Sequence, residues 1–417
     1  MPTAPGESAT QVASADSARM PLTIVVAIAC LSLAALGSSA SLRVNDALLP
    51  RLAEEFSIDL GTAAQATSIF AVAYGVAQLF FGPMGERYGK YRVIGWGCMG
   101  AAVSSALCGF AWDFSTLRAM RALAGLSAAA IIPLSMAWIG DVVPYQSRHH
   151  VLARFLIGQI VGLSAGTWLG GYAADHWNWH VPYWALGVHF LLIGVAVLAS
   201  NRTLPAHARA TRPLGASALR GIASEFVQVL RVPWARAVLT CVFLEGIVLY
   251  GPFAFLAAHF SRSYGISLSA AGSMMMVYSL GGFAFAVASR HLVGSLGEAG
   301  LVRTGGSMLA ASLLVLAFAP TWQWAVPSTF AAGMGFYMLH STFQLNATQM
   351  APERRGSALS SFAFCFFVGQ SIGVYGSGIA VDRVGTRNVI SCGAIALLVL
   401  SFAFARMRSR LPSPKAA

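Results

Sequence analysis

The chain has 417 residues, of which 57% are hydrophobic and 10% are charged, and its mean hydropathy is +0.66. Soluble domains carry about 25% charged residues, so this composition excludes a soluble globular protein and indicates that most of the chain lies in lipid. The net charge of +12 does not indicate nucleic-acid binding, because the basic residues occur in short groups between apolar runs. The six cysteines lie singly within apolar segments, so no metal site or redox pair is expected.

Polar segments divide the chain into two sets of apolar runs. Residues 1–20 lack the basic start of a signal peptide, and we expect a disordered cytoplasmic N-terminal tail. Residues 21–200 and 234–406 each contain six apolar runs of about the 20 residues that a membrane-spanning helix needs. Residues 201–233 predict a cytoplasmic linker with a short amphipathic helix, and residues 407–417 predict a cytoplasmic C-terminal tail. The twelve predicted helices cover residues 22–49, 61–83, 92–111, 114–138, 151–173, 181–200, 234–260, 268–289, 301–319, 322–348, 358–380 and 388–405.

The positions of lysine and arginine predict the orientation of these helices. Cytoplasmic connections of membrane proteins retain an excess of Lys and Arg. With both termini in the cytoplasm, most of the 27 basic residues fall in cytoplasmic segments, whereas the reverse orientation places most of them outside. We therefore expect a multi-pass protein of the bacterial cytoplasmic (inner) membrane with both termini in the cytoplasm.

An internal repeat relates the two sets of helices. The segment VGLSAGTWLGGYAAD at residues 161–175 matches VGQSIGVYGSGIAVD at residues 368–382, at a constant offset of 207. Chance similarity between apolar helices supplies some glycine matches, but it does not readily supply the terminal Asp175 and Asp382 as well. The offset spans an even number of helices, so the sequence predicts two six-helix halves with the same orientation.

The loop after the second predicted helix carries a family motif. Residues 82–92 read GPMGERYGKYR, which resembles the GxxxDRxGRR loop of the major facilitator superfamily of transporters. The resemblance implies that Glu86 lies near residues 356–357, at the start of the eleventh helix, and that Arg87 reaches Asp141. Such contacts would latch the cytoplasmic side shut in the outward-facing state, although the charges are also explained as topology signals alone. The implied latch residues are Gly82, Glu86, Arg87, Gly89 and Asp141.

Two further helices carry motifs that resemble those of the same family. The fourth predicted helix contains an RxxxG pattern, and the fifth contains GLSAGTWLGG, similar to the GxxxGPxxGG signature associated with exporters but with Thr167 in place of Pro. Small residues four apart allow helices to pack backbone to backbone, so we expect packing roles for Gly125, Gly162, Gly166, Gly170 and Gly171.

The resemblance covers essentially the whole chain and is greatest to drug and metabolite:proton antiporters of the sugar-efflux and multidrug type. It implies an all-α integral membrane fold of twelve transmembrane helices in two pseudo-symmetric six-helix bundles.

Four charged residues lie deep in predicted helices: Arg43 and Asp46 in the first, Arg121 in the fourth and Glu245 in the seventh. Charges inside a bilayer are costly and usually face a cavity or one another, and in this family helices 1, 4, 7 and 10 line the cavity. Glu245 lies near the middle of its helix, so we expect it to carry the coupled proton; the alternative is a structural partner of Arg121. Asp46 either neutralises Arg43 one turn away, or pairs with Arg121 and changes partner during transport.

Neutral polar and aromatic residues on the predicted lining helices are candidates for binding a substrate. Each of them is also explained by packing alone. The one histidine among them, His340, could titrate or could simply be a buried hydrogen-bond partner. The candidates are Tyr74, Gln78, Tyr278, His340, Gln344 and Gln370.

These features predict a proton-coupled secondary transporter that exports a small organic compound (a drug, sugar or metabolite) by alternating access. The alternative is a proton-coupled importer of an organic solute such as a carboxylate, bound directly by Arg43 and Arg121. A membrane enzyme or sensor on the same fold is disfavoured, because the sequence has no nucleophile–base pair, metal-ligand set or phosphate-binding loop. We expect small-molecule substrate, protons and the lipid bilayer as partners of a monomer, and neither nucleic acid nor a cofactor.

Overall fold

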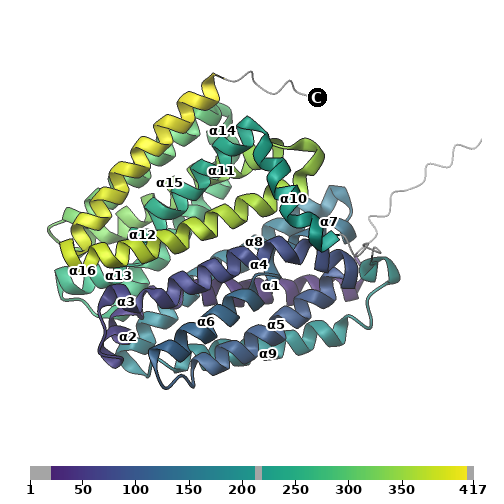
Figure 1. Ribbon diagram of the computed structural model, residues 1–417, viewed down its shortest axis with the longest axis horizontal. Coiled ribbons are helices and arrows are strands. Elements are labelled where there is room, and N and C mark those ends of the chain that lie inside the picture. Colours follow the sequence, from purple (N-terminus) through teal and green to yellow (C-terminus); the bar gives the residue numbers. More distant parts are fainter. Residues whose placement is uncertain (1–19, 212–217, 411–417) are drawn as a thin grey trace, which may run out of the picture.

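A computed structural model describes residues 20–211 and 218–410, and within these ranges the regular secondary structure is helical throughout (Figure 1). The predicted N-terminal tail (apart from Met20), the end of the C-terminal tail and residues 212–217 of the predicted linker lie outside the described residues. The last helix continues to Ser409, so it extends into the segment predicted as a C-terminal tail.

The first group of helices ends at residue 200. Gly89, with φ +91°, adopts a backbone conformation that favours glycine, and it lets one helix end and the next begin without a loop. Asp113 accepts a hydrogen bond from the backbone N–H of Thr116 at 2.6 Å and thereby caps the helix that begins at Phe114. The helices are α1 (Leu22–Arg43), α2 (Leu49–Glu55), α3 (Leu60–Ala63), α4 (Gln65–Tyr88), α5 (Lys90–Cys108), α6 (Phe114–Ala128), α7 (Ile131–Val142), α8 (Tyr145–His176) and α9 (Val181–Ser200).

The second group contains two helices that are too long for one crossing of a membrane. Gly297 (φ +63°) and Gly385 (φ +82°) interrupt them with non-helical backbone, so each consists of two helical segments joined at a glycine. The elements are the 3₁₀ turn η1 (Ala206–Arg209), α10 (Ala218–Arg231), α11 (Pro233–Glu245), the π-helix η2 (Gly246–Tyr250), α12 (Gly251–Phe253), α13 (Leu256–Tyr264), α14 (Leu268–Phe318), η3 (Trp322–Trp324), α15 (Ala325–Gln349), η4 (Pro352–Arg354) and α16 (Arg355–Ser409).

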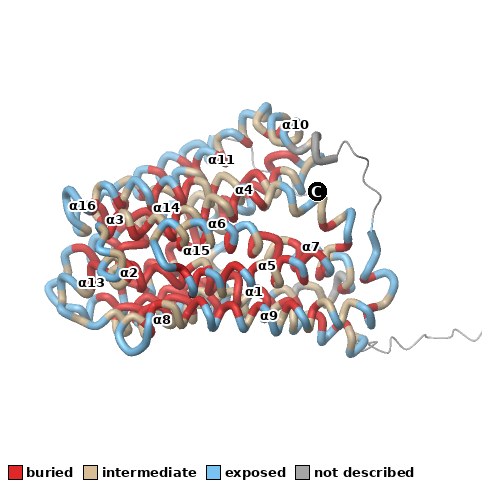
Figure 2. Tube along the Cα trace, turned by 60° about the horizontal axis from the view of Figure 1, so that its bottom comes forward, coloured by how far each residue is buried: buried red, intermediate tan, exposed pale blue. Residues whose placement is uncertain are grey.

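Eight helical segments of the described chain are long and apolar enough to cross a membrane. The exposed residues lie on the outer faces of the helices and include large apolar side chains such as Val287, Leu192 and Phe283, while Figure 2 shows the buried residues concentrated between helices. Helices satisfy their own backbone hydrogen bonds, so they can present these faces to lipid. The protein is an all-helical, multi-pass membrane protein.

The buried apolar side chains form two large clusters. One joins mainly α1 to α9, and the other joins mainly α10 to α16. In Figure 1 the purple-to-teal helices lie beside the green-to-yellow helices, and the two groups diverge toward the end that carries α7 and α10.

Glycines bring α8 against α1 at backbone distance. A Cβ at Gly162 or Gly166 would overlap a carbonyl oxygen of α1, and one at Gly170 that of Val44, the residue directly after α1. The three oxygens belong to residues 36, 40 and 44, which are also four apart. The other two glycines expected to pack are similar, because a Cβ at Gly125 would overlap the Phe70 carbonyl and one at Gly171 the Leu268 carbonyl.

The same contact recurs in the second group at the offset of 207. A Cβ at Gly369 would overlap the Phe243 carbonyl oxygen, and one at Gly373 the Ile247 carbonyl oxygen. α16 therefore packs on α11 and η2 as α8 packs on α1, with matching positions in contact.

We predict that Gly166→Leu strongly lowers the stability of the protein. Overpacking a tight contact costs about 1–3 kcal/mol, and here the new side chain meets backbone that has no rotamer to change. The yield of protein in membranes and its melting temperature in detergent are therefore expected to fall. Gly376→Leu is the matched control, because Gly376 is exposed and its Cβ would meet no heavy atom within 4 Å. Equal stability of the two variants would contradict the packing argument.

Candidate functional site

Two carboxylates close one end of the molecule by binding helix N-termini of the other helix group. Asp175, at the end of α8, accepts hydrogen bonds from the backbone N–H groups of Leu268 (3.2 Å) and Ser269 (2.6 Å) at the start of α14. Asp382 of α16 accepts one from the backbone N–H of Gly61 at 3.1 Å, in α3. The first N–H groups of a helix lack internal acceptors and carry partial positive charge, so a carboxylate stabilises them.

These two contacts are equivalent in the repeat. Asp175 and Asp382 are 207 residues apart, and so are Gly61 and Leu268. We call the end defined by these four residues the closed end; it carries α2, α3 and α13 (Figure 1). The structure thus gives both repeated aspartates the same role, which is to join the two helix groups.

We call the opposite end, which carries α7 and α10, the linker end; the carboxylate contact described next lies within the second group. Glu225 of α10 accepts hydrogen bonds from the Arg354 guanidinium (2.5 Å) and the Ser357 hydroxyl (3.2 Å) at the start of α16. The bond from Arg354 holds the pKa of Glu225 below its usual value. A Cβ at Gly356 would meet no heavy atom within 4 Å, so the helix start beside Ser357 is uncrowded.

The predicted latch residues lie at the linker end, with two differences in pairing. The carboxylate that binds Ser357 at the start of α16 is Glu225, where Glu86 was expected, and Asp141 pairs with Lys90. Lys90, not Arg87, reaches Asp141, with Nζ 2.8 Å from the carboxylate, and it also contacts Glu86 at 2.5 Å. The Arg87 guanidinium lies over the ring of Tyr88 at 5.2 Å. The reason is that Lys90 opens α5, whose first turn lies beside the last turn of α7, where Asp141 is. Gly82 is exposed, and Gly89 makes the turn between α4 and α5.

Arg43 and Asp46 form a buried ion pair at the boundary of the two groups. Arg43 Nη1 lies 3.3 Å from Asp46 Oδ2, and the two residues are 7% and 0% exposed. The guanidinium also lies over the ring of Tyr250 from the second group, 4.1 Å from its centroid. Of the two interpretations of Asp46, this conformation contains the pair with Arg43.

Arg121 is bound by neutral groups. Its Nε donates to the carbonyl of Ala66 at 3.2 Å and its Nη2 to the carbonyl of Ser41 at 3.0 Å. The guanidinium lies 4.2 Å from the ring centroid of Phe70. Arg121 makes no ion pair with Asp46 or Glu245 in the described structure, so the expected alternatives that paired it with a carboxylate are absent from this conformation.

Glu245 pairs with His340. Its Oε2 lies 2.8 Å from His340 Nδ1, and the carboxyl group is fully buried, with no hydrogen-bond partner for Oε1 among the described residues. The His340 side chain is 17% exposed and stacks on Phe336 at 5.0 Å. Glu245 ends α11, immediately before the π-helix η2, and π-helical turns occur often at functional sites. The sequence predicted both residues as site candidates but not their contact.

The other predicted substrate residues are dispersed. The ring of Tyr74 contacts the ring of Phe367 of the second group in a tilted arrangement, with 4.6 Å between centroids. Gln370 is fully buried, and neither atom of its amide group has a hydrogen-bond partner among the described residues. Gln78 is half-buried and Gln344 is exposed, and neither hydrogen-bonds to the four buried charges. Tyr278 lines a cavity together with Arg43.

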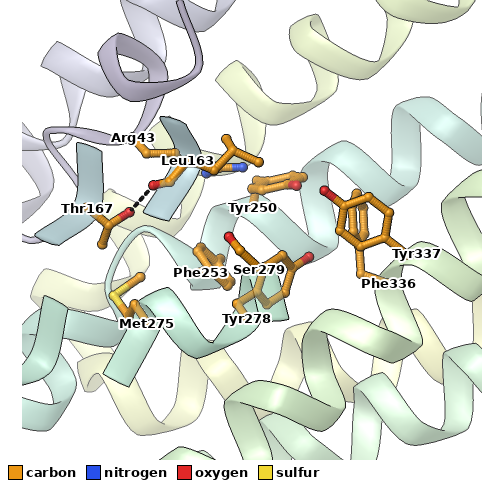
Figure 3. Close-up of a pocket in the computed structure, with 10 residues that line it drawn as sticks. All are labelled: Arg43, Leu163, Thr167, Tyr250, Phe253, Met275, Tyr278, Ser279, Phe336 and Tyr337. Carbon is orange, nitrogen blue, oxygen red and sulfur yellow. Dashed lines mark hydrogen bonds between the residues drawn. The ribbon is translucent and has the colours of Figure 1, made fainter. Parts of the chain in front are cut away.

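This cavity lies between the two groups and has a volume of about 40 Å³ (Figure 3). Residues of α1 and α8 line it on one side, and residues of η2, α12, α14 and α15 on the other. Most of the aromatic lining was not predicted; the one local sequence signal is the Gly-Pro pair at residues 251–252, which disturbs the helix after Glu245. The lining residues are Arg43, Leu163, Thr167, Tyr250, Phe253, Met275, Tyr278, Ser279, Phe336 and Tyr337.

Known proteins share this sequence pattern. Residues 31–374 match the profile of the Major Facilitator Superfamily. The chain is 25% identical over 358 residues to the MFS-type transporter YceJ of Bacillus subtilis (strain 168), which covers 85% of this chain and 89% of YceJ. It is 23% identical over 387 residues to the inner membrane transport protein YnfM of Escherichia coli (strain K12), with coverage of 91% and 89%. A shorter match of 186 residues, 26% identical, covers 43% of this chain and 36% of the multidrug export protein EmrB of Escherichia coli (strain K12).

Solved structures share the fold. A POT family transporter in complex with 5-aminolevulinic acid has a TM-score of 0.75 at 13% identity, covering 93% of this chain and 96% of that one. A bacterial homologue of the human lysosomal transporter Spinster, in an inward-facing and unoccupied conformation, has a TM-score of 0.70 at 16% identity, covering 95% and 100%. The resemblance in the sequence motifs is confirmed by the family match: the chain belongs to the major facilitator superfamily of membrane transporters.

Proposed function

We propose that this protein is a proton-coupled secondary transporter that exports a small organic compound by alternating access. The observation that carries the proposal is the Glu245–His340 pair. A carboxyl group and an imidazole in hydrogen-bond contact can share and exchange a proton, and a carboxylate buried in a membrane is costly unless it is paired or protonated. Uptake of a proton by the pair changes its net charge, which couples protonation to a change of conformation.

The proposal includes twelve membrane-spanning helices in two six-helix bundles, residues 21–200 and 234–406. The count follows from the eight apolar segments if α14 and α16 each cross twice, turning at Gly297 and Gly385, and if α5 and α15 also cross. The repeated packing of α8 on α1 and of α16 on α11 supports two equivalent bundles.

We assign the linker end to the cytoplasm. Its connections carry many of the arginines, including Arg202, Arg209 and Arg231 before the seventh helix, and basic residues are retained on the cytoplasmic side. Both termini then lie in the cytoplasm, and the closed end is periplasmic. Under this assignment the conformation is an inward-facing state, in which Asp175 and Asp382 hold the periplasmic side shut.

Export is supported by two observations. Relatives with matching segments include proteins named as efflux or export pumps, such as EmrB. The glycine-rich face of α8 also resembles the signature of exporters. In the proposed cycle, the outward-facing protein takes a proton from the periplasm onto the Glu245–His340 pair and releases substrate. The inward-facing protein releases the proton to the cytoplasm and binds the next substrate. The proposed cycle needs one protein chain, so the proposed transporter is a monomer.

Import of an organic carboxylate is the second candidate, and Arg43 at the cavity would bind a carboxylate in either direction of transport. Proteoliposomes with an imposed pH gradient distinguish the two candidates. A substrate gradient should accelerate dissipation of the pH gradient in one direction only, and that direction identifies export or import.

We predict that Glu245→Gln abolishes coupling while leaving substrate exchange intact. Glutamine keeps the shape and hydrogen bonds of a protonated carboxyl group but cannot release a proton. Transport driven by a pH gradient should therefore fall at least about tenfold, the effect of 1.4 kcal/mol on a rate. Exchange of labelled for unlabelled substrate without a gradient should persist. Glu54→Gln, at an exposed carboxylate, is the control. Full gradient-driven transport by Glu245→Gln would rule out this proton site.

We predict that the double variant Asp175→Asn, Asp382→Asn opens the closed end. Each carboxylate at a helix N-terminus contributes about 0.3–1 kcal/mol, so removal of both charges shifts the inward-to-outward ratio by about threefold to thirtyfold. Spin labels at positions 54 and 262, which line a groove at this end from the two groups, report the shift as a population at longer distance. The exposed Cys392 is first replaced by Ser.

The control for this experiment is Asp59→Asn. Asp59 lines the same groove but makes no side-chain cap bond to a helix. An identical distance distribution in the double variant and in the control would show that the two caps do not hold the periplasmic side shut.

A further inference from the structure

The cavity beside Arg43 combines a buried cation with unused hydrogen-bond donors. One Nη1 donor of the guanidinium binds Asp46, and its other N–H groups make no hydrogen bond within the described part of the chain. Figure 3 shows the guanidinium directed toward the ring of Tyr250 inside the cavity. Arginine presents its donors in a planar fork that matches a carboxylate or phosphate. An arginine buried this far with unused donors therefore has capacity for an anionic ligand.

A second polar group, from another helix, points to the same ligand. The hydroxyl of Tyr278 on α14 is buried at the cavity and interacts with the hydroxyl of Tyr250, but it makes no well-formed hydrogen bond among the described residues. Buried polar groups are almost always hydrogen-bonded, so a native exception requires an explanation. A ligand oxygen between Arg43 and Tyr278 would satisfy both groups.

The charges around the cavity favour an anion over a cation. Arg43 is the one charged side chain among the described residues that line the cavity. The four buried charges, Arg43, Asp46, Arg121 and Glu245, sum to zero over the two groups, but neither carboxylate is part of the lining. A bound anion would therefore meet a cation in the cavity wall and would occupy the donors that Arg43 leaves unused.

The size and walls of the cavity limit which anion fits. A cavity needs about 10–15 Å³ to hold one water, so about 40 Å³ accommodates a group of roughly three heavy atoms, such as a carboxylate. The walls are the rings of Tyr250, Phe253 and Phe336, and Phe336 also stacks on His340. A carboxylate at Arg43 thus places the remainder of its molecule along aromatic rings that lead to the Glu245–His340 pair.

We propose that the cavity is the subsite for the carboxylate of the transported compound, which is an aromatic or amphipathic organic acid. Arg43 supplies the charge-assisted donors, Tyr278 supplies a neutral donor, and the aromatic rings contact the apolar body. The inference rests on the proposed transport function and names its substrate class. It also links binding to conformation, because Arg43 and Tyr278 belong to different helix groups and a carboxylate between them holds the groups together.

Binding of benzoate to the purified protein tests the inference. Benzamide has the same shape without the charge, and sodium chloride and sodium phosphate supply inorganic anions at matched ionic strength. We expect benzoate at millimolar concentrations to raise the melting temperature in proportion to occupancy, and benzamide and the inorganic salts to leave it unchanged. A shift with chloride or phosphate but not with benzoate would overturn the proposal, as would equal shifts with benzoate and benzamide.

Two variants locate the bound anion. Arg43→Gln combined with Asp46→Asn removes both charges of the pair, so no lone charge is left buried, and it should abolish the benzoate shift. Tyr278→Phe removes only a hydroxyl that makes no well-formed hydrogen bond among the described residues, so it should fold normally and weaken benzoate binding about threefold to tenfold, the effect of one hydrogen bond. Unaltered binding in both variants would overturn the proposal. If the double variant does not fold, Tyr278→Phe alone decides.

These measurements need no proton gradient. Absence of benzoate binding therefore leaves the proton coupling of Glu245 untouched, and a failure of proton coupling leaves the binding result intact.

Discussion

The functional geometry of this protein depends on two glycine faces that allow helices to touch along their backbones. α8 presents glycines at four-residue spacing to α1, and α16 presents glycines to α11 and η2. α1 carries Arg43 and Asp46, and α11 carries Glu245. Because the glycines have no side chains, α8 contacts the backbone of α1, and α16 contacts the backbone of α11 and η2. These contacts fix the position of α1 and α11 along the helix axis and their rotation about it. A side chain larger than hydrogen at these positions would displace the charges as well as the helices.

The two halves of the repeat have equivalent helices but different side chains at equivalent positions. Arg43 and Tyr250 are 207 residues apart, and they contact each other across the boundary between the two groups at 4.1 Å. Asp46 and Phe253 have the same offset. The first group thus supplies an ion pair at the position where the second supplies aromatic rings. Because the two positions are equivalent but carry different residues, the Arg43 guanidinium meets the Tyr250 ring. Two arginines at these positions would repel each other.

At the closed end the repeat keeps both geometry and residue type. Asp175 and Asp382 are equivalent in contact as well as in position, since each accepts hydrogen bonds from a helix start in the opposite group, and the two starts are themselves equivalent. Such bonds break and re-form without burying an unpaired charge deep in the bilayer, since both partners lie at helix ends. Contacts of this kind are compatible with the repeated opening that the proposed cycle requires, whereas the close backbone packing of the glycine faces is not.

The sequence by itself determined that most of the chain lies in lipid, that its elements are helices, and which family it resembles. Apolar runs of helical length, the glycine spacing and the loop motif at residues 82–92 are local features, and each follows from residues within a few turns of one another. The repeated aspartates were visible in the sequence for the same reason. Even so, the sequence contained no indication of what they bind, because the backbone N–H donors lie about 90 residues or more away along the chain.

Only the tertiary structure decided which polar groups meet. Glu245 and His340 are 95 positions apart, and their contact depends on the rotation of α11 and α15 about their axes. Lys90 reaches Asp141 where Arg87 was expected, because a turn at Gly89 directs the next helix toward α7. The cavity at Arg43 draws its lining from six helical elements. Hydrophobic periodicity specifies that a helix is buried in lipid or protein, but the pairing of side chains across helices is set by packing, which no single segment of sequence encodes.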